Sequence, residues 1–227
     1  MDRTFIALDV ETTGLEPGVD EIIEVAAVKF RGAEVLETFQ QLVRPRQSLP
    51  LKITRLTGIA EADLADAPRF SAIAPDLVRF VKSYPIIGHS IGFDLSMLKA
   101  QGMTFAQPSY DTFEMATLLM PQAPIYRLSA LAERLGIDHP DDHRALNDSD
   151  VCRQVFTHLL GRMEALSLND LNEIVRLTAK VSWPLRELFV EVQQARARLA
   201  LVEGTAARPT GDERPAQQPF TPLKPTG

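Results

Sequence analysis

Two carboxylates, Asp9 and Glu11, are the first residues of the chain whose types and spacing could do chemistry, and they stand at the polar end of the apolar run 5–11. Side chains two residues apart on a strand point to the same face, so this pair can share a metal ion. The glycine-containing turn at 12–18 leaves that face open at a strand end. Because an isolated D-x-E pair is more commonly solvated, a metal site requires further acids nearby.

Two further acids each occupy the first turn of an expected helix. Asp94 follows a short apolar strand, and on its own it could act simply as a helix N-cap or as a partner of the helix dipole. Asp148 lies on the helix face shared with Cys152, Val155 and Leu159, so we expect it to point toward the core. A core-facing acid needs a partner, which distinguishes Asp148 from a solvated surface charge.

These acids occur within three motifs that resemble those of a known family. The motifs are Asp9-x-Glu11-Thr-Thr-Gly-Leu, His89-x-x-x-Phe93-Asp94 and His143-Arg-Ala-Leu-Asn-Asp148, in that order. They resemble the three exonuclease motifs of the DEDDh family (DnaQ-like 3′–5′ exonucleases), and the resemblance covers residues 4–160. The stretches 57–59, 110–112 and 128–137 also resemble landmarks of this family.

Within the family, the chain is most similar to the proofreading epsilon-subunit type of DNA polymerase III. The stretches 56–59 and 126–131, with the helical continuation through Trp183, look closest to exonuclease domains joined to DinG-type helicases. No G-x-x-x-x-G-K-[S/T] phosphate loop occurs in the sequence, so the chain itself carries no helicase motor.

The resemblance implies an RNase H-like fold and a two-metal site. Asp9, Glu11 and Asp148 resemble the ligands of one catalytic ion, and Asp9 would bridge to a second ion held with help from Asp94. Four acids suit two Mg²⁺ or Mn²⁺ ions about 4 Å apart, because these hard cations prefer oxygen ligands. One ion would activate water, and the other would stabilise the departing 3′ oxygen.

The resemblance also implies a histidine general base. His143 precedes Asp148 by five positions, which is the spacing of the histidine subgroup, and Arg144 stands where the tyrosine subgroup would place its Tyr. An imidazole whose pKa lies near the working pH can take the proton from the attacking water. We expect the neighbouring histidines, His139 and His158, to be ordinary surface residues.

Three residues are candidates for contact with the substrate. Thr13 and Leu15 resemble the family positions that pack against the terminal nucleotide, where a small apolar wedge would favour a single-stranded end. His89 could contact a phosphate or could support the loop that carries Asp94, and we favour support. Asp111 belongs to a landmark that is usually structural, so it is left out of the catalytic set.

The chain departs from the family pattern at three positions, none of which is a predicted metal ligand. Ser90 replaces the Asn that often follows the histidine, Thr57 replaces the His that often precedes Gly-Ile, and Ser149 replaces the Ala that often follows the last Asp.

The elements that must position these residues follow from hydrophobic periodicity. Apolar runs predict strands over 5–11, 22–30 and 35–43, joined as an antiparallel meander, and a short strand over 85–89. Helical periodicity predicts helices over 70–81, 93–100, 128–135 and 147–160. Strands followed by alternating helices and strands indicate a mixed α/β fold with a sheet flanked by helices.

The chain is expected to have three parts. Residues 1–163 form the exonuclease domain, and residues 164–203 form a helical extension with one helix over 168–180 and another opening at Trp183. From Gly204 the chain is proline-rich and poor in apolar residues, so residues 204–227 are predicted to be a disordered tail or linker.

Composition narrows the functional classes. The 227 residues carry a net charge of -6, so the protein as a whole would repel a polyanion and any nucleic-acid site must be local. A single cysteine, Cys152, excludes an intrachain disulfide framework. No apolar run is long enough to span a bilayer and the N-terminus lacks a signal-peptide pattern, so a cytoplasmic location without a membrane partner is expected.

The leading hypothesis is therefore a metal-dependent 3′–5′ exonuclease that releases nucleoside 5′-monophosphates from single-stranded or frayed DNA ends, in replication proofreading or repair. An RNA-directed exonuclease is one alternative, because the metal chemistry does not distinguish the sugars. The other is an interaction module in which the apolar stripe from Leu185 to Leu199 binds a polymerase, clamp or helicase, although such stripes more often pack on their own domain.

Overall fold

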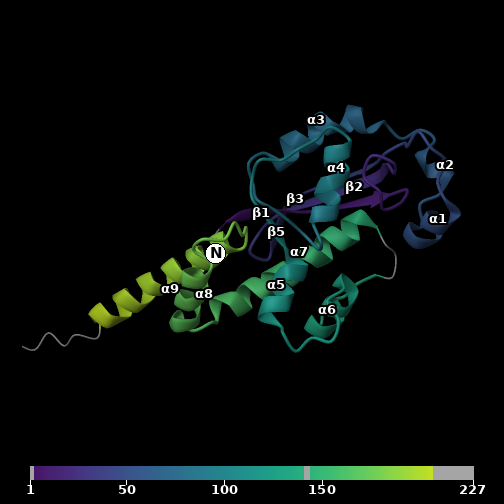
Figure 1. Ribbon diagram of the computed structural model, residues 1–227. Helices are drawn as coiled ribbons and strands as arrows, with labels where there is room; N and C mark the ends of the chain where they lie inside the picture. Colours follow the sequence, from purple (N-terminus) through teal and green to yellow (C-terminus); the bar gives the residue numbers. More distant parts are fainter. Residues whose placement is uncertain (1–2, 141–143, 207–227) are drawn as a thin grey trace, which may run out of the picture.

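A computed structural model describes residues 3–140 and 144–206, and the side chains among them up to residue 199. Its five strands form one sheet in the order β3-β2-β1-β4-β5 (Figure 1). The central strand β1 (Thr4–Thr12) is antiparallel to β2 (Ile22–Arg31), which is antiparallel to β3 (Glu34–Leu42). On its other side, β1 pairs in parallel with β4 (Ile86–Gly88), and β4 pairs in parallel with β5 (Ser109–Asp111).

Helices cover both faces of the sheet. Figure 1 shows α3 above the sheet and the long helix α7 below it. The described helices are α1 (Leu51–Thr57), α2 (Glu61–Leu64), α3 (Phe70–Val81), α4 (Gly92–Ala100), α5 (Thr112–Leu119), α6 (Leu128–Leu135), α7 (Ala145–Glu164), α8 (Leu168–Leu177) and α9 (Arg186–Ala206). The layer arrangement is the mixed α/β architecture that the hydrophobic pattern predicts.

The alternation of β1 divides the core into two large clusters. Phe5 and Ala7 face the cluster that α5, α6, α7 and α9 complete, whereas Ile6, Leu8 and Val10 face the cluster that α3 and α4 complete. Apolar side chains therefore occupy both faces of β1, as expected for a strand at the centre of a covered sheet. This two-sided burial makes β1 a rigid base for the acids at its carboxyl end.

The longer elements lie where the sequence predicts them. The antiparallel meander of the first three strands is confirmed, and the helices predicted over 70–81 and 128–135 have these bounds. The helix predicted over 147–160 is longer, at 145–164, and the one predicted over 168–180 ends at Leu177. Helix α9 begins at Arg186, three residues after Trp183, and continues past Gly204 to Ala206, so the predicted tail boundary falls inside this helix.

Four short elements are not predicted by the sequence patterns. These are α1, α2, β5 and α5, each between three and eight residues long. Such short segments show too little of a hydrophobic period to be told from loops. One signal is present: α1 follows Pro50 and ends at Gly58, whose φ of 71° is left-handed and suits glycine.

The C-terminal helices pack on the sheet domain. Leu185, Leu188, Phe189 and Val192 are buried in the same cluster as the α7 core, so most of the apolar stripe of α9 is covered by its own chain. The Trp183 ring stacks on Phe189 with 5.4 Å between ring centroids. The stripe thus has the more common role, which is packing within its own domain. Within the described residues, no helix combines the length and apolar character needed to cross a bilayer.

The packing of α9 predicts different costs for two leucines on the same helix. Leu188 is 0% exposed and Leu199 is 58% exposed. We expect Leu188→Ala to lower the free energy of unfolding by about 2–5 kcal/mol, because it leaves a cavity in the core. The matched control Leu199→Ala should change it by less than about 0.5 kcal/mol. Urea denaturation measures both, and similar small effects would show that α9 is not part of the core.

Candidate active site

Three carboxylates converge at the carboxyl end of β1. Ligand atoms of Asp9, Glu11 and Asp148 all lie within 4.8 Å of one another. Asp9 and Glu11 share one face of β1, and in the β1–β2 register they are opposite Ala26 and Glu24. The shared face and the convergence with the helix-borne acid are as the sequence predicts. Directly after Glu11 the register with β2 shifts, so regular pairing ends beside the acids.

Asp148 reaches this cluster because the start of α7 is fastened to β2. The carboxylate of Glu24, which is fully buried, accepts hydrogen bonds from the guanidinium of Arg144 at 2.7 and 3.1 Å. It also accepts the backbone N–H of Ala145 at 3.1 Å and the side-chain amide of Gln40 at 2.8 Å. Since Glu24 is the register partner of Glu11, this contact sets the first turn of α7 beside the acids of β1.

Asp94 enters from the opposite side, in the first turn of α4. Its Oδ1 accepts the backbone N–H of Val10 at 3.0 Å, and its side chain is buried. Strand β4 pairs with β1 only at Ile6 and Ala7, so the N–H of Val10 lies beyond the ladder. Asp94 therefore supplies the acceptor that a longer strand would have supplied, and this bond holds its carboxylate beside Asp9.

Crowding and burial oppose ionisation of these acids. Burial raises the pKa of Glu11 to about 8, and the Asp148 carboxylate adds to the rise. Burial also raises the pKa of Asp9 well above its ordinary value, with the charge of Asp94 as the next cause. The pKa of Asp94 is raised to about 7 by burial, although the hydrogen bond from Val10 opposes that shift. A divalent cation held by these oxygens would remove the repulsion, so the cluster fits such an ion.

Two histidines, His139 and His143, precede α7 in the sequence. His143, the predicted base, lies outside the described residues. His139 was expected to be a surface residue, and this was wrong: its side chain is only 13% exposed, and its Nε2 lies 3.0 Å from Asp148 Oδ1. No local pattern in the sequence identifies His139, because its role depends on a tertiary contact with Asp148. His158 is exposed, as expected.

A tight turn follows the acids at the end of β1. Thr13 is buried, and its hydroxyl donates to Asp20 at 3.0 Å while accepting the N–H of Glu21 at 3.0 Å. The Asp20 carboxyl packs so close to Gly14 that a Cβ there would stand 2.3 Å from it, so a larger residue would displace this carboxyl from its hydrogen bonds with Thr13 and Glu16. The turn leaves Leu15 79% exposed beside the acids.

Leu15 borders an apolar groove that begins at the acidic cluster. The groove has a volume of about 360 Å³. It is lined by Val10, Glu11, Thr12, Gly14, Leu15, Lys52, Ile53, Leu56 and Phe93. Helix α1, which the sequence patterns do not predict, supplies one wall of it. The groove thus places apolar side chains directly beside carboxylates.

The loop that carries Asp94 is supported by the next strand and helix. His89 Nδ1 lies 2.9 Å from the Thr112 hydroxyl, and burial lowers the pKa of this histidine. Asp111 Oδ1 accepts the N–H groups of Ser90 and Phe113, both at 2.9 Å, so it caps α5 and fastens the loop. Ser90 has a φ of 61°, a left-handed conformation that Asn adopts more readily than Ser.

The other two departures from the family pattern also have structural partners. The Thr57 hydroxyl donates to the Ile53 carbonyl at 3.0 Å and accepts the N–H of Ile59 at 3.1 Å, which closes the end of α1. The Ser149 hydroxyl donates to the Ala26 carbonyl at 3.3 Å, so it links α7 to β2. Both side chains are buried.

Comparison with known proteins agrees with this geometry. The RNase T family model, described as an exonuclease, matches residues 6–156. DNA polymerase III PolC-type of Thermotoga maritima is 32% identical over 193 residues, which cover 83% of this chain and 14% of that relative. DNA polymerase III subunit epsilon of Aquifex aeolicus is 32% identical over 168 residues, which cover 72% of this chain and 83% of that relative. This chain thus spans only a small part of the PolC-type relative.

A third relative and a solved structure complete the comparison. The 3′-5′ exonuclease DinG of Bacillus subtilis is 31% identical over 182 residues, covering 78% of this chain and 20% of that relative. The crystal structure of E. coli exonuclease I in complex with a dA16 oligonucleotide has a TM-score of 0.62 at 20% identity, covering 70% of this chain and 41% of that chain. The identities of the three relatives are nearly equal, so they do not separate the epsilon type from the DinG type.

The raised carboxyl pKa values predict the pH dependence of stability without metal. A carboxyl whose pKa is higher in the folded protein stabilises the fold while protonated, and that stability is lost as pH rises. In EDTA we therefore expect Tm to fall between about pH 4.5 and about pH 8, the interval over which the pKa of Glu11 is displaced. Adding Mg²⁺ at pH 8 should restore Tm, as measured by differential scanning fluorimetry.

The Asp9→Asn variant tests the cause of this dependence. Replacing one of the buried, titrating carboxyl groups by a neutral amide should raise the metal-free Tm at pH 8 by a few degrees and flatten its fall with pH, while Mg²⁺ should no longer raise Tm. Asp66→Asn, at an exposed position, serves as the control and should behave as the parent does. If Asp9→Asn and Asp66→Asn gave the same pH profile, repulsion within the acidic cluster would not be the cause.

Proposed function

This chain belongs to the RNase T exonuclease family and has its RNase H-like fold, and from that premise we propose that it is a metal-dependent 3′–5′ exonuclease. It would hydrolyse single-stranded or frayed DNA 3′ ends to nucleoside 5′-monophosphates, in replication proofreading or repair. The convergence of Asp9, Glu11 and Asp148 within 4.8 Å carries the proposal. Residues 1–163 would form the exonuclease domain, with 164–203 as its helical extension.

The acidic cluster would hold two Mg²⁺ or Mn²⁺ ions. Asp9, Glu11 and Asp148 would bind one ion, and Asp9 with Asp94 would bind the other. When bound, such ions supply Lewis-acid stabilisation of charge on the phosphate and lower the pKa of water. The donor set supports this assignment, because all four side chains offer carboxylate oxygen, and burial together with the neighbouring carboxylates raises the pKa of three of them.

The groove beside Leu15 would receive the terminal nucleotide. Its walls include Leu56 and Phe93, apolar side chains on which a base can stack or pack, and it opens directly at Glu11. A base that enters this groove cannot remain paired with a complementary strand. The exposed Leu15 would therefore act as a wedge that favours an unpaired 3′ end, while the internal hydrogen bonds of Thr13 hold the turn that carries it.

His143 would act as the general base that takes the proton from the attacking water. Its place four residues before Asn147 and five before Asp148 sets it just ahead of the first turn of α7, the turn that Glu24 fastens to β2. His139 would position Asp148 through the 3.0 Å contact of its Nε2. His89 would support the Asp94 loop through Thr112.

The names of two sequence relatives support DNA as the substrate and a replication or repair setting. Both are named as components of DNA polymerase III. A polymerase or a helicase is accordingly the proposed partner. The burial of the α9 stripe argues against an interaction module without catalysis, and all four acids are present.

Removing a predicted ligand should abolish hydrolysis. With 5′-labelled single-stranded DNA and Mg²⁺, the parent should produce a ladder that shortens from the 3′ end, whereas Asp9→Ala and Asp148→Ala should lower the rate by at least about 1,000-fold, because the ions lose a ligand. EDTA should have the same effect on the parent. Duplex with a mismatched 3′ end, matched duplex and single-stranded RNA in parallel reactions rank the substrates, and faster RNA degradation would favour the exoribonuclease. Parental turnover by Asp9→Ala would refute the site.

The two histidines can be separated by kinetics. His143→Ala should lower kcat by about 100- to 10,000-fold with little change in Mg²⁺ affinity, because a general base contributes to the transition state and not to ion binding. His139→Ala should have a smaller effect on kcat and should weaken Mg²⁺ binding, because Asp148 loses its partner. The reverse pattern would transfer the base role to His139, the histidine that lies beside the acids in the described structure.

A further inference from the structure

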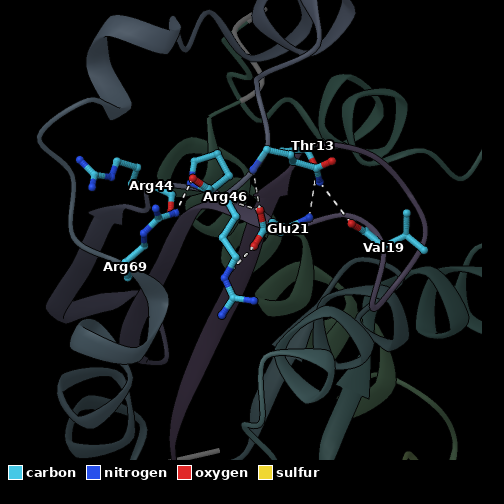
Figure 2. A network of polar contacts seen from close by, with 8 residues as sticks. Thr13, Val19, Glu21, Arg44, Arg46 and Arg69 are labelled. Atoms are coloured by element: carbon cyan, nitrogen blue, oxygen red, sulfur yellow. Dashed lines mark hydrogen bonds and ion pairs between the residues drawn. The ribbon is translucent and has the colours of Figure 1, made fainter.

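Three arginines surround a cleft on the far side of the turn that carries Leu15. We call it the arginine cleft and define it by Arg44, Arg46 and Arg69 (Figure 2). Its volume is about 450 Å³, and among the described residues that line it Glu21 is the one carboxylate. This positive charge is local, because the chain as a whole has a net charge of -6. The proposed reaction makes no use of it.

Two of the arginines are held by carbonyl groups and not by acids. Arg69 Nη1 donates to the carbonyls of Arg44, at 3.0 Å, and of Pro45, while Arg44 Nη1 donates to the carbonyl of Ala65 at 2.6 Å. Carbonyl partners orient a guanidinium but leave its full charge in place. Arg46 is the most exposed, with its side chain 88% accessible and its Nε 4.0 Å from Glu21. The cleft therefore presents two oriented guanidinium groups and one exposed guanidinium group, with Glu21 as the one carboxylate among its described lining residues.

The arginine cleft is connected to the acidic site through the turn between them. The side-chain amide of Gln47 donates to the Thr13 hydroxyl at 2.8 Å and to the Val19 carbonyl at 3.2 Å. Glu21 accepts the backbone N–H groups of Arg46 and, at 3.1 Å, of Gln47. Figure 2 shows these contacts joining the loop that carries Arg44 and Arg46 to the turn between Thr13 and Val19. These hydrogen bonds thus fasten the loop that carries Arg46 to the turn.

The surface beside the arginine cleft is also hollowed. A second hollow, of about 520 Å³, is lined by residues 18–21 of the turn, with the carboxylates of Asp20 and Glu21 among them, and shares Glu21, Arg46 and Gln101 with the cleft. Gln101 follows α4, whose first turn carries Asp94, and a helix rises about 10 Å over these seven residues. A single strand of a few nucleotides can span that distance.

We propose that the arginine cleft binds the phosphodiester backbone of a single nucleic-acid strand several nucleotides upstream of the 3′ end. This inference rests on the proposed function, because it takes the strand to end at the acidic cluster. The strand would cross the 13–21 turn and place one or more phosphates among Arg44, Arg46 and Arg69. Guanidinium groups suit this role because their planar N–H donors match phosphate oxygens. The cleft would supply the local positive charge that the protein as a whole lacks.

Charge reversal at Arg46 tests the cleft directly. Arg46 is chosen because the guanidinium groups of Arg44 and Arg69 hold neighbouring backbone segments, whereas that of Arg46 extends into solvent. The matched control is Arg176→Glu, which changes the net charge equally on α8, at the opposite end of the molecule from α1 (Figure 1). Binding of 5′-fluorescein-labelled dT16 and dT2 is measured by fluorescence anisotropy, with Ca²⁺ in place of Mg²⁺ so that the acidic site holds a cation.

For the dT16 probe we expect Arg46→Glu to raise Kd by about 3- to 10-fold at 100 mM salt, and to reduce the slope of log Kd against log salt by about 0.7, the value for one phosphate on a single strand. The Kd of Arg46→Glu for dT2, which is too short to reach the cleft, should change by less than twofold. The control Arg176→Glu should bind both probes as the parent does. The proposal would be overturned if both variants bound dT16 equally weakly, or if Arg46→Glu lost the same affinity for both probes. It would also be overturned if Arg46→Glu bound dT16 as tightly as the parent does.

Two further measurements distinguish a nucleic-acid strand from a free anion and from an acidic polypeptide. Binding of inorganic phosphate at micromolar concentration that depends on Arg46, measured by calorimetry, would overturn the proposal and assign the cleft to a free anion. Competition by poly-glutamate as effective as that by unlabelled dT16 would overturn it in favour of an acidic polypeptide. Hydrolysis of thymidine 5′-p-nitrophenyl phosphate by the parent reports on the acidic site alone, so failure of the exonuclease proposal is distinguishable from failure of the cleft.

Discussion

Mutual repulsion among carboxylates at one strand end is the constraint on which the rest of this structure depends. Burial and like charge both raise the pKa of Asp9 and Glu11, so the fold must hold these groups together against a force that would separate them. The two-sided core around β1 makes this feasible, because apolar packing on both faces fixes the strand that carries the acids. The arrangement is a site whose charge is balanced only when cations or protons are present.

Glu24 shows how the same sheet buries a carboxylate whose charge is compensated. It is completely buried, yet its oxygens are satisfied by the Arg144 guanidinium, the Ala145 N–H and the Gln40 amide. A buried ion pair with every partner present is better evidence of specific placement than of net stability. Here the ion pair fixes the position of the first turn of α7 on β2. Glu11 is the register partner of Glu24, so the two residues have similar places in the sheet. They differ in the hydrogen-bond donors around their carboxylates.

Most of the sheet and the long helices could be predicted from the sequence, because their hydrophobic periods are local. The helix over 70–81 has five buried apolar residues on one face, which is enough to identify it. The acids could be predicted too, since Asp9 and Glu11 follow the period of a strand and Asp148 that of a helix. The short elements α1 and α5 could not be predicted, although α1 supplies a wall of the apolar groove.

The contacts that the sequence could not predict join residues far apart in the chain or in irregular segments. Glu24 and Arg144 are separated by 120 positions, and neither residue type signals the other. His139 reaches Asp148 from a loop whose path no periodicity describes. Arg44, Arg46 and Arg69 come from a loop and from the residue before α3, and in the sequence they have the pattern of isolated surface charges. Tertiary placement, and not residue type, gives these residues their roles.

The fastening of α7 to β2 has a consequence for the order of folding. The acids of β1 are synthesised before α7, because Asp148 and the Glu24 contact require a segment more than a hundred residues later. Bringing such distant segments together incurs loop-closure entropy, so this contact belongs to the slow, high-contact-order part of folding. During synthesis, a chain that has formed only its first three strands carries two of the four acids. The complete cluster therefore arises only when the sheet and α7 have docked, which couples assembly of the candidate site to completion of the fold.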